Sequence, residues 1–276
     1  MEYTFEVIAL GVRGSVPVSG EQTARYGGNT SCYLVRTGEQ SLLLDAGSGL
    51  TRLNRPLDGG PASGDRPMAL LLTHAHGDHV MGLPLFWRMF DPEFRCQVCG
   101  PAWRGMGVRA QYGHYMSPPT WPVGPEAFRA ALSWRDLRES GDRLELGGVL
   151  VEAQGVRHPG ATVAYRLTKD GKRLVYAPDM ELAGETDQRM TDFCRDCDLL
   201  LADGQYTRAE YPRKRGWGHS AMEDAAGLGL RAGVRRTILT HHAPDRTDDA
   251  LDALAHQLRQ WNPSAAFARE GDVWRI

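Results

Sequence analysis

Three histidines and an aspartate lie within six positions of the stretch LLLTHAHGDHVMGLP, at His74, His76, Asp78 and His79. Imidazole and carboxylate groups are good ligands for zinc, manganese or iron, and burying them without partners is costly. Residues two apart in an extended segment point to the same side, so His74 and His76 can hold one metal ion. The turn that follows can direct Asp78 and His79 towards a second ion. The stretch therefore predicts a metal centre rather than a solvated loop.

The apolar run before these residues predicts a buried strand that delivers them at its carboxyl end. Other apolar or alternating runs predict further strands, within residues 3–11, 31–38, 40–49, 68–79, 94–101, 146–160, 162–181, 197–207 and 235–245. KDGK at 169–172 predicts a hairpin turn. Helical patterns cover 220–233 and 248–262, and 82–90 opens a short helix. The proline-rich stretch 116–128 predicts a surface loop, because it suits neither a helix nor a central strand.

Both halves of the chain run from strands to helices, which indicates an α/β protein whose two β-rich halves face each other with helices outside. No linker divides the sequence, so we expect a single domain over residues 1–276. A net charge of −2 provides no basic field for a long nucleic acid. No apolar stretch approaches ~18 residues, so we expect no membrane partner. The start of the chain lacks a signal-peptide pattern and the cysteine count is odd, so we expect a cytoplasmic protein with reduced thiols.

The motif His-x-His-x-Asp-His at the end of a buried strand resembles the hallmark of the metallo-β-lactamase superfamily. The resemblance runs from about Arg13 to Asp249 and implies an αββα sandwich of two mixed β-sheets with outer helices. It also implies two divalent metal ions, either zinc or manganese. One ion would be held by His74, His76, His158 and Asp179, and the other by Asp78, His79, Asp179 and His241. The family's early aspartate matches Asp45 and supports the site from behind the ligands.

The later ligands follow from the order of the family's motifs. His158 lies in VRHPG, which matches the third motif, and Asp179 lies in VYAPDME, which matches the aspartate that bridges both metals. The last histidine has two candidates, His241 and His242. We choose His241 because the preceding Leu-Thr repeats the step from strand to ligand in LLLTH. Two ions about 3.5–4 Å apart lower the pKa of a bridging water and hold a phosphoryl or carbonyl oxygen.

Three further features resemble the ribonuclease Z-like and cyclic-phosphate phosphodiesterase branch. The opening GVRGSVPVSG resembles that of the branch, and its glycines suit a loop that approaches an anion closely. GWGHSAMEDAA places His219 and Ser220 at a helix start, where the branch has a histidine facing the scissile phosphate. Asp203 stands where ribonuclease Z has a glutamate paired with that histidine. Such a carboxylate raises the imidazole pKa and keeps it able to donate a proton.

These resemblances imply a binuclear metal-dependent hydrolase, and we expect a phosphodiesterase for a small or cyclic phosphodiester, such as a cyclic nucleotide or a sugar cyclic phosphate. An activated water attacks phosphorus, Asp78 orients it, and His219 with Asp203 stabilises the leaving side. Ribonuclease Z-like cleavage of RNA is one alternative, although we find no counterpart of the long Gly/Pro-rich arm that grips tRNA. Hydrolysis of a lactone or thioester is another, and a metal-binding sensor without turnover is a third.

Other side chains near these motifs are candidates for substrate contact, namely Tyr206, Trp217 and Ser220. The basic run 213–215 precedes GWGHS, where it would steer a phosphate or form a solvated turn. The loop 112–123 combines aromatic residues with prolines. It suits a lid that stacks a ring, a contact in a homodimer, or ordinary surface packing. We expect His114 in this loop to be a polar residue rather than a ligand.

The cysteines include two Cys-x-x-Cys pairs, Cys96 with Cys99 and Cys194 with Cys197. Cys96 and Cys99 lie three apart on an expected strand, so their side chains face opposite sides of the sheet. The two pairs also lie far apart along the chain. We therefore expect buried reduced thiols rather than a structural zinc site.

Overall fold

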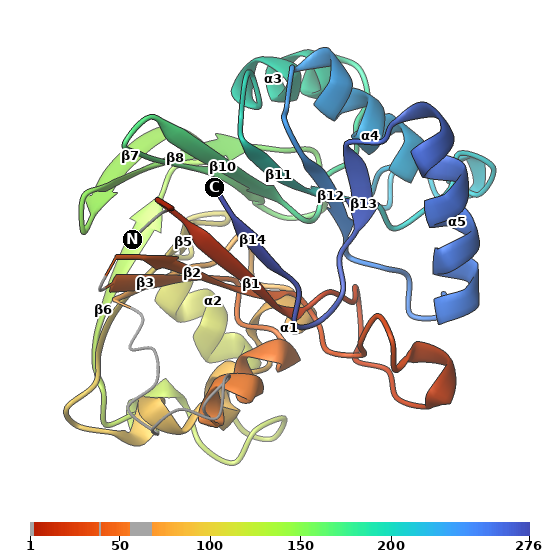
Figure 1. Ribbon diagram of the computed structural model, residues 1–276. Coiled ribbons are helices and arrows are strands. Elements are labelled where there is room, and N and C mark those ends of the chain that lie inside the picture. Colours follow the sequence, from red (N-terminus) through yellow and green to blue (C-terminus); the bar gives the residue numbers. More distant parts are fainter. Residues whose placement is uncertain (1–2, 39, 56–67) are drawn as a thin grey trace.

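The computed structural model describes residues 3–38, 40–55 and 68–276. Two seven-stranded sheets lie face to face, with helices on both outer sides (Figure 1). The first sheet has the strand order β14-β1-β2-β3-β4-β5-β6. Its strands are β1 (Glu6–Gly11), β2 (Cys32–Thr37), β3 (Gln40–Leu44), β4 (Ala69–Leu71), β5 (Arg95–Pro101), β6 (Ala131–Leu137) and β14 (Val273–Arg275).

The second sheet has the strand order β13-β12-β11-β10-β9-β8-β7. Its strands are β7 (Ser140–Leu146), β8 (Val149–Gly155), β9 (Val163–Lys169), β10 (Lys172–Ala177), β11 (Leu199–Asp203), β12 (Thr237–Thr240) and β13 (Ala265–Phe267). The hairpin between β9 and β10 turns at Asp170 and Gly171, as KDGK predicts.

Both sheets are mixed, and in the same way. Strands β14 to β3 of the first sheet and β7 to β10 of the second pair antiparallel. The pairs from β3 to β6 and from β10 to β13 are parallel. Because parallel strands end at the same edge of a sheet, the segments after β3, β4, β10, β11 and β12 gather at one edge of the sandwich. These segments carry the polar residues that the sequence singles out.

The two sheets share one hydrophobic core. Val35 and Leu71 of the first sheet belong to the same buried cluster as Val151 and Leu174 of the second. Each such side chain contributes about 1.5–3 kcal/mol on burial, so the facing surfaces hold the sheets together. This shared core supports our proposal that the chain forms a single domain.

Helices cover the outer faces of both sheets. On the second sheet these are α3 (Glu185–Phe193), α4 (Met222–Arg231) and α5 (Asp248–Trp261) (Figure 1). The first sheet is covered by α2 (Val108–Tyr115) and by short 3-10 helices that include η2 (Ser48–Asn54). The four-residue helix α1 (Gly77–Val80) follows β4 at the edge of the sandwich. Among the described residues, no helix is long and apolar enough to cross a membrane.

Several predicted boundaries need correction. The short helix expected at 82–90 is two 3-10 helices, η3 (Leu83–Leu85) and η4 (Trp87–Phe90). The loop expected at 112–123 begins inside α2, where Tyr112 is buried against Phe128 and Trp134. The start of α2 is held by Asp136, which accepts the Val108 N–H at 2.7 Å. Because Asp136 lies in the distant strand β6, the sequence next to Val108 contains no capping motif that predicts the start of the helix.

Candidate metal centre

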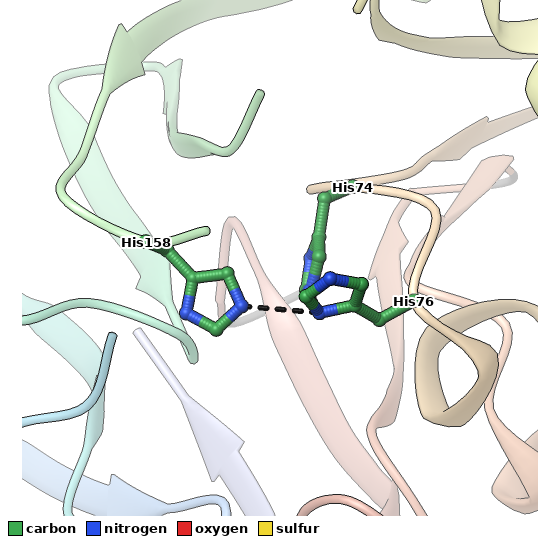
Figure 2. Close-up of side chains that lie close together, drawn as sticks. All are labelled: His74, His76 and His158. Carbon is green, nitrogen blue, oxygen red and sulfur yellow. Dashed lines mark hydrogen bonds between the residues drawn. The ribbon is translucent and has the colours of Figure 1, made fainter. Parts of the chain in front are cut away.

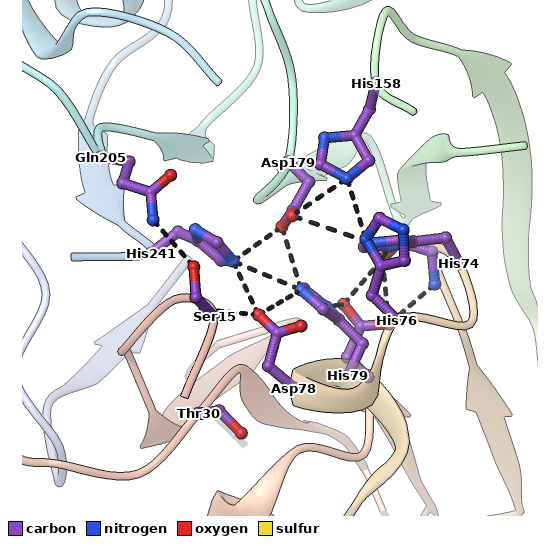
Figure 3. Close-up of polar contacts among 12 residues, drawn as sticks. Ser15, Thr30, His74, His76, Asp78, His79, His158, Asp179, Gln205 and His241 are labelled. Carbon is purple, nitrogen blue, oxygen red and sulfur yellow. Dashed lines mark hydrogen bonds and ion pairs between the residues drawn. The ribbon is translucent and has the colours of Figure 1, made fainter. Parts of the chain in front are cut away.

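Local geometry after β4 brings the first histidine pair together. His76 stands in extended conformation just before α1, and its Nδ1 lies 2.9 Å from His74 Nε2. The single turn of α1 then directs Asp78 and His79 to the other side of the cluster (Figure 3). The four side chains therefore divide into two groups.

The first group is formed by His74, His76 and His158 (Figure 2). His158 Nε2 lies 3.1 Å from His76 Nδ1, while His158 Nδ1–H donates to the Gly218 carbonyl at 2.9 Å. Burial lowers the pKa of all three imidazoles, so their neutral forms prevail. Neutral ring nitrogens that face one another present converging lone pairs, which is the arrangement a cation such as zinc binds.

The second group is formed by Asp78, His79 and His241, all buried. Asp78 Oδ2 lies 3.3 Å from His79 Nε2 and 3.2 Å from His241 Nε2. His241 takes a positive φ of 59° directly after β12, a conformation that costs a non-glycine residue about 1–2 kcal/mol. This backbone conformation points the His241 ring towards the cluster.

Asp179 joins the two groups. Its Oδ2 lies 3.7 Å from Nε2 of both His74 and His158, whereas its Oδ1 lies 3.1 Å from Nε2 of both His79 and His241. Although burial opposes its charge, the surrounding imidazoles hold the pKa of Asp179 well below its usual range. Oδ1 is buried without a hydrogen bond from the described residues. A buried carboxylate with one oxygen towards each group fits a ligand shared by two cations.

Asp45 lies behind His79. Its Oδ2 accepts the His79 Nδ1–H at 2.7 Å and the Tyr176 hydroxyl at 2.8 Å, and its Oδ1 accepts the Thr73 N–H at 2.7 Å. The first of these bonds orients the His79 ring so that Nε2 faces the cluster.

The adjacent residues His241 and His242 point their rings in different directions. The His242 ring turns away from the cluster, where its Nε2 donates to the Ala268 carbonyl at 2.8 Å and its ring packs against Tyr26 and Phe267. Burial lowers the pKa of His242 to about 3, so it stays neutral. His241, not His242, faces the donors of the cluster.

His219 lies beside the cluster and is held by Asp203. Its Nδ1–H donates to Asp203 Oδ2 at 2.8 Å, and its ring stacks on His241 with centroids 4.8 Å apart. Asp203 is fully buried and also accepts the N–H groups of Met180 and Gln205. Although burial opposes the charge, Asp203 and the nearby carboxylates raise the pKa of His219 to about 9. Without bound metal, His219 is therefore positively charged near neutral pH and able to donate a proton.

Similarity to known proteins identifies the family. A model of the beta-lactamase superfamily domain matches residues 40–242. The chain belongs to this superfamily. Ribonuclease Z of Mycolicibacterium paratuberculosis is 30% identical over 285 residues, covering 97% of this chain and 94% of that protein. The probable metallo-hydrolase YhfI of Bacillus subtilis is 25% identical over 273 residues, covering 98% of this chain and 99% of YhfI.

Solved structures agree with this assignment. The crystal structure of YhfI matches with a TM-score of 0.75 at 20% identity and covers 100% of both chains. A diphosphatase from the PhnP family matches with a TM-score of 0.71 at 16% identity, covering 99% of this chain and 98% of that one. The predicted metallo-β-lactamase sandwich is thereby confirmed, and the chain is a metallo-hydrolase of the beta-lactamase superfamily.

The N-terminal loop of this superfamily member serves the centre in a way that the sequence did not reveal. The Ser15 N–H donates to Asp78 Oδ2 at 2.7 Å, so the anion that the loop approaches is a carboxylate of the protein itself. A Cβ at Gly14 would lie 2.3 Å from His241 Nδ1, which explains the glycine beside it. Gln205 links the loop to the end of β11, because its Nε2 donates to Ser15 Oγ at 3.2 Å.

The prediction that Ser220 contacts the substrate needs correction. Its side chain is buried, and its hydroxyl donates to the Met180 carbonyl while accepting the Leu182 N–H at 3.1 Å. Both partners lie in the segment that carries Asp179, so Ser220 anchors that segment. Glu181 in the same segment was missed. It accepts the Tyr211 hydroxyl at 2.7 Å and the Gly216 N–H at 2.9 Å, which ties down the loop before His219.

Two pockets flank the cluster. One, which we call the Trp103 pocket, has a volume of about 540 Å³ and is lined by residues that include His74, His76, Trp103, Met106, His114 and Pro159. The other, the Lys214 pocket, has a volume of about 350 Å³ and is lined by residues that include Tyr206, Glu210, Lys214, Trp217, His219 and Arg246. Tyr206 and Trp217 thus line the Lys214 pocket, where their contact with a substrate stays a prediction, and His114 lines the Trp103 pocket from α2.

The four cysteines of the two Cys-x-x-Cys pairs are buried in the hydrophobic cores. Cys96 packs in the outer core of the first sheet and Cys99 in the core between the sheets, on opposite faces of β5. Cys194 and Cys197 are buried under α3 and α4, and burial raises the pKa of all four thiols. Among the described residues, no potential metal group includes a cysteine.

Proposed function

We propose that the chain is a binuclear metal-dependent phosphodiesterase that acts on a small phosphodiester. The ligands are His74, His76, His158 and Asp179 for one ion, and Asp78, His79, Asp179 and His241 for the other. The placement of one Asp179 oxygen towards each group supports this division. When bound, two divalent ions neutralise charge on a phosphoryl oxygen and lower the pKa of a water molecule. The histidine-rich donor set favours zinc.

The Asp203–His219 pair carries the assignment to phosphodiesters. An alkoxide is a poor leaving group, so cleavage of an unactivated diester needs a proton at the departing oxygen. His219 has one nitrogen held by Asp203 at 2.8 Å and its ring packed against His158 and His241 of the cluster. A buried acid beside a metal centre meets this need, whereas a thioester releases a thiolate that departs without a proton.

The reaction divides among named side chains. Asp78, fixed by the Ser15 N–H, orients the attacking water. Water adds to phosphorus, the bond from phosphorus to the leaving oxygen breaks, and that oxygen takes the proton from His219. The products are a phosphate monoester and an alcohol. The attacking water releases a proton to solvent, and His219 takes one up from solvent; Asp203 favours this uptake by stabilising the positive charge of the imidazolium.

A small substrate is supported by the pocket volumes of about 540 and 350 Å³ and by the net charge of −2. RNA cleavage is the second candidate, because a relative that aligns over 97% of the chain is named ribonuclease Z. The two are separated by incubating the metal-loaded protein with a precursor tRNA and with small diesters. Cleavage of the tRNA at micromolar concentration, with negligible turnover of small diesters, selects the RNA endonuclease.

The proposal is tested by hydrolysis of bis-p-nitrophenyl phosphate and a panel of cyclic nucleotides with zinc and with manganese. A lactone and a thioester are assayed in parallel with the same preparation. Turnover of the cyclic nucleotides that falls roughly 10²-fold or more in His219→Ala, with a smaller fall for bis-p-nitrophenyl phosphate and with metal content unchanged, supports the proposal. Acyl turnover that survives in His219→Ala but disappears in His76→Ala contradicts it and selects an acyl hydrolase.

A further inference from the structure

The Trp103 pocket opens directly beside the cluster, because His74 and His76 form part of its wall. Trp103 lines this pocket and is 40% exposed. Met106, Pro159 and Ala161 extend the apolar wall. Its volume of about 540 Å³ falls within the range of about 300–1,000 Å³ that is typical of ligand pockets.

The wall that carries Trp103 is held rigidly. Trp103 and Met106 face each other across a tight turn, with backbone hydrogen bonds of 2.9 and 2.8 Å in the two directions. Gln111 of α2 clamps the turn, because its Nε2 donates to the carbonyls of Pro101 at 2.8 Å and Met106 at 3.0 Å. These bonds fix the backbone that carries Trp103, and the Arg104 guanidinium stacks on the Trp103 ring with Cζ 5.2 Å from the centroid. Because the turn is already fixed, little backbone entropy is lost when a ring stacks on the exposed part of the indole.

The charges of the two pockets differ. Among the described residues, the Trp103 pocket is lined by no aspartate, glutamate, lysine or arginine. The Lys214 pocket is lined by charged residues that include Glu210, Lys214 and Arg246, and also by His219. The proton donor therefore stands on the Lys214 side of the cluster. An uncharged group is favoured on the Trp103 side.

We infer that the Trp103 pocket binds a planar, uncharged ring of the substrate, such as a nucleobase, on the part of the diester that remains attached to phosphate after cleavage. The alcohol then departs towards the Lys214 pocket, which His219 lines. This inference rests on the proposed function, and it deepens it by naming the substrate class: a phosphodiester that bears a nucleoside or a similar ring. The phosphate monoester product keeps the ring in the Trp103 pocket.

The inference is tested by calorimetric binding of two product analogues, AMP and ribose 5-phosphate, to the zinc-loaded protein. Base stacking on an aromatic side chain predicts that AMP binds about 10- to 100-fold more tightly than ribose 5-phosphate. Trp103→Ala is expected to bring the affinity for AMP down to that for ribose 5-phosphate. Trp261→Ala is the matched control, because Trp261 is an exposed indole on α5, and it is expected to retain the full preference.

Equal affinities for the two compounds in the unmodified protein, or an undiminished preference in Trp103→Ala, overturn the ring pocket. Met106→Ala decides the matter if Trp103→Ala does not fold, and a preference reduced by at least about threefold is expected there. Failure of the proposed function is recognised separately. A protein that prefers AMP but hydrolyses no diester contradicts the phosphodiesterase proposal while leaving the ring pocket intact.

Discussion

The Trp103 pocket and the Lys214 pocket border the same cluster of histidines and aspartates, yet they are built differently. The first is walled by Trp103, Met106 and Pro159 and carries no fixed charge among the described residues. In the second, Arg246 is paired with Glu210 at 2.7 Å, and the Lys214 ammonium lies 4.1 Å from the centroid of the Trp217 ring. In the proposed reaction, this difference separates substrate recognition from proton transfer: the ring binds in the Trp103 pocket, and the leaving oxygen faces the Lys214 pocket.

The largest effect is expected at Asp179, because both groups of metal ligands share this residue. Asp179→Asn removes the charge that faces both ligand groups, so we predict loss of bound metal and a fall in kcat on the order of 10³-fold for every substrate. Elemental analysis after dialysis measures the metal, and turnover is measured on the same sample. Retention of two metal equivalents with near-normal kcat would contradict the assignment of Asp179 as the shared ligand.

A smaller effect, confined to the Lys214 side, is expected from Asp203→Asn. The protonated form of His219 is the active acid, so activity falls as the pH rises through its pKa, which Asp203 raises to about 9. Without that carboxylate the pKa drops, and we predict that the alkaline limb moves to lower pH and that kcat at pH 8 falls roughly 10-fold. Bound cations lower both pKa values, but the difference between the two proteins remains.

The pH dependence of kcat is compared with that of Asp192→Asn, a surface carboxylate on α3 that serves as the control. Because Asp203 also accepts two backbone N–H groups, thermal unfolding is recorded for each variant. An alkaline limb that stays in place in a folded Asp203→Asn protein would refute the role of the pair.

The smallest effect is expected from Lys214→Ala. Lys214 is a partly exposed cation in the Lys214 pocket, and screened charges of this kind contribute up to about 1 kcal/mol. We predict a rise in KM of roughly 3- to 10-fold that shrinks as salt is added, with little change in kcat. Arg189→Ala removes an exposed cation on α3 and serves as the control. A change in kcat alone would mean that Lys214 acts in the chemical step instead.

Much of the fold was predictable because its central strands are apolar runs that end in polar residues. Edge strands were missed for a physical reason: β6 and β7 are half exposed, and β13 and β14 are only three residues each, so their patterns are weak. Helix α3 was missed because its exposed face is rich in polar residues. In the edge strands, pairing with the neighbouring strand, rather than local sequence preference, determines the conformation.

Site residues that lie close together in the sequence were easier to predict than those that lie far apart. His74, His76, Asp78 and His79 are visible as one motif, whereas His158 became visible only through resemblance to a family. Proximity in sequence to His219 wrongly suggested that Ser220 contacts the substrate. Its hydroxyl instead bonds to the backbone of Met180 and Leu182. The Trp103 pocket left no sequence signal, because it forms where the turn after β5 meets the distant segment of Pro159.

The central claim is that His219 protonates the leaving oxygen, and the dependence of rate on the leaving group tests it most directly. Two diesters of the same nucleoside monophosphate are compared in the unmodified protein and in His219→Ala, one releasing p-nitrophenolate and the other an alkyl alcohol. The acidic phenol departs without help, whereas the alkoxide needs a proton. We predict a loss of kcat that is at least about tenfold greater for the alkyl ester. Equal losses for both esters, with metal content unchanged, would contradict the claim.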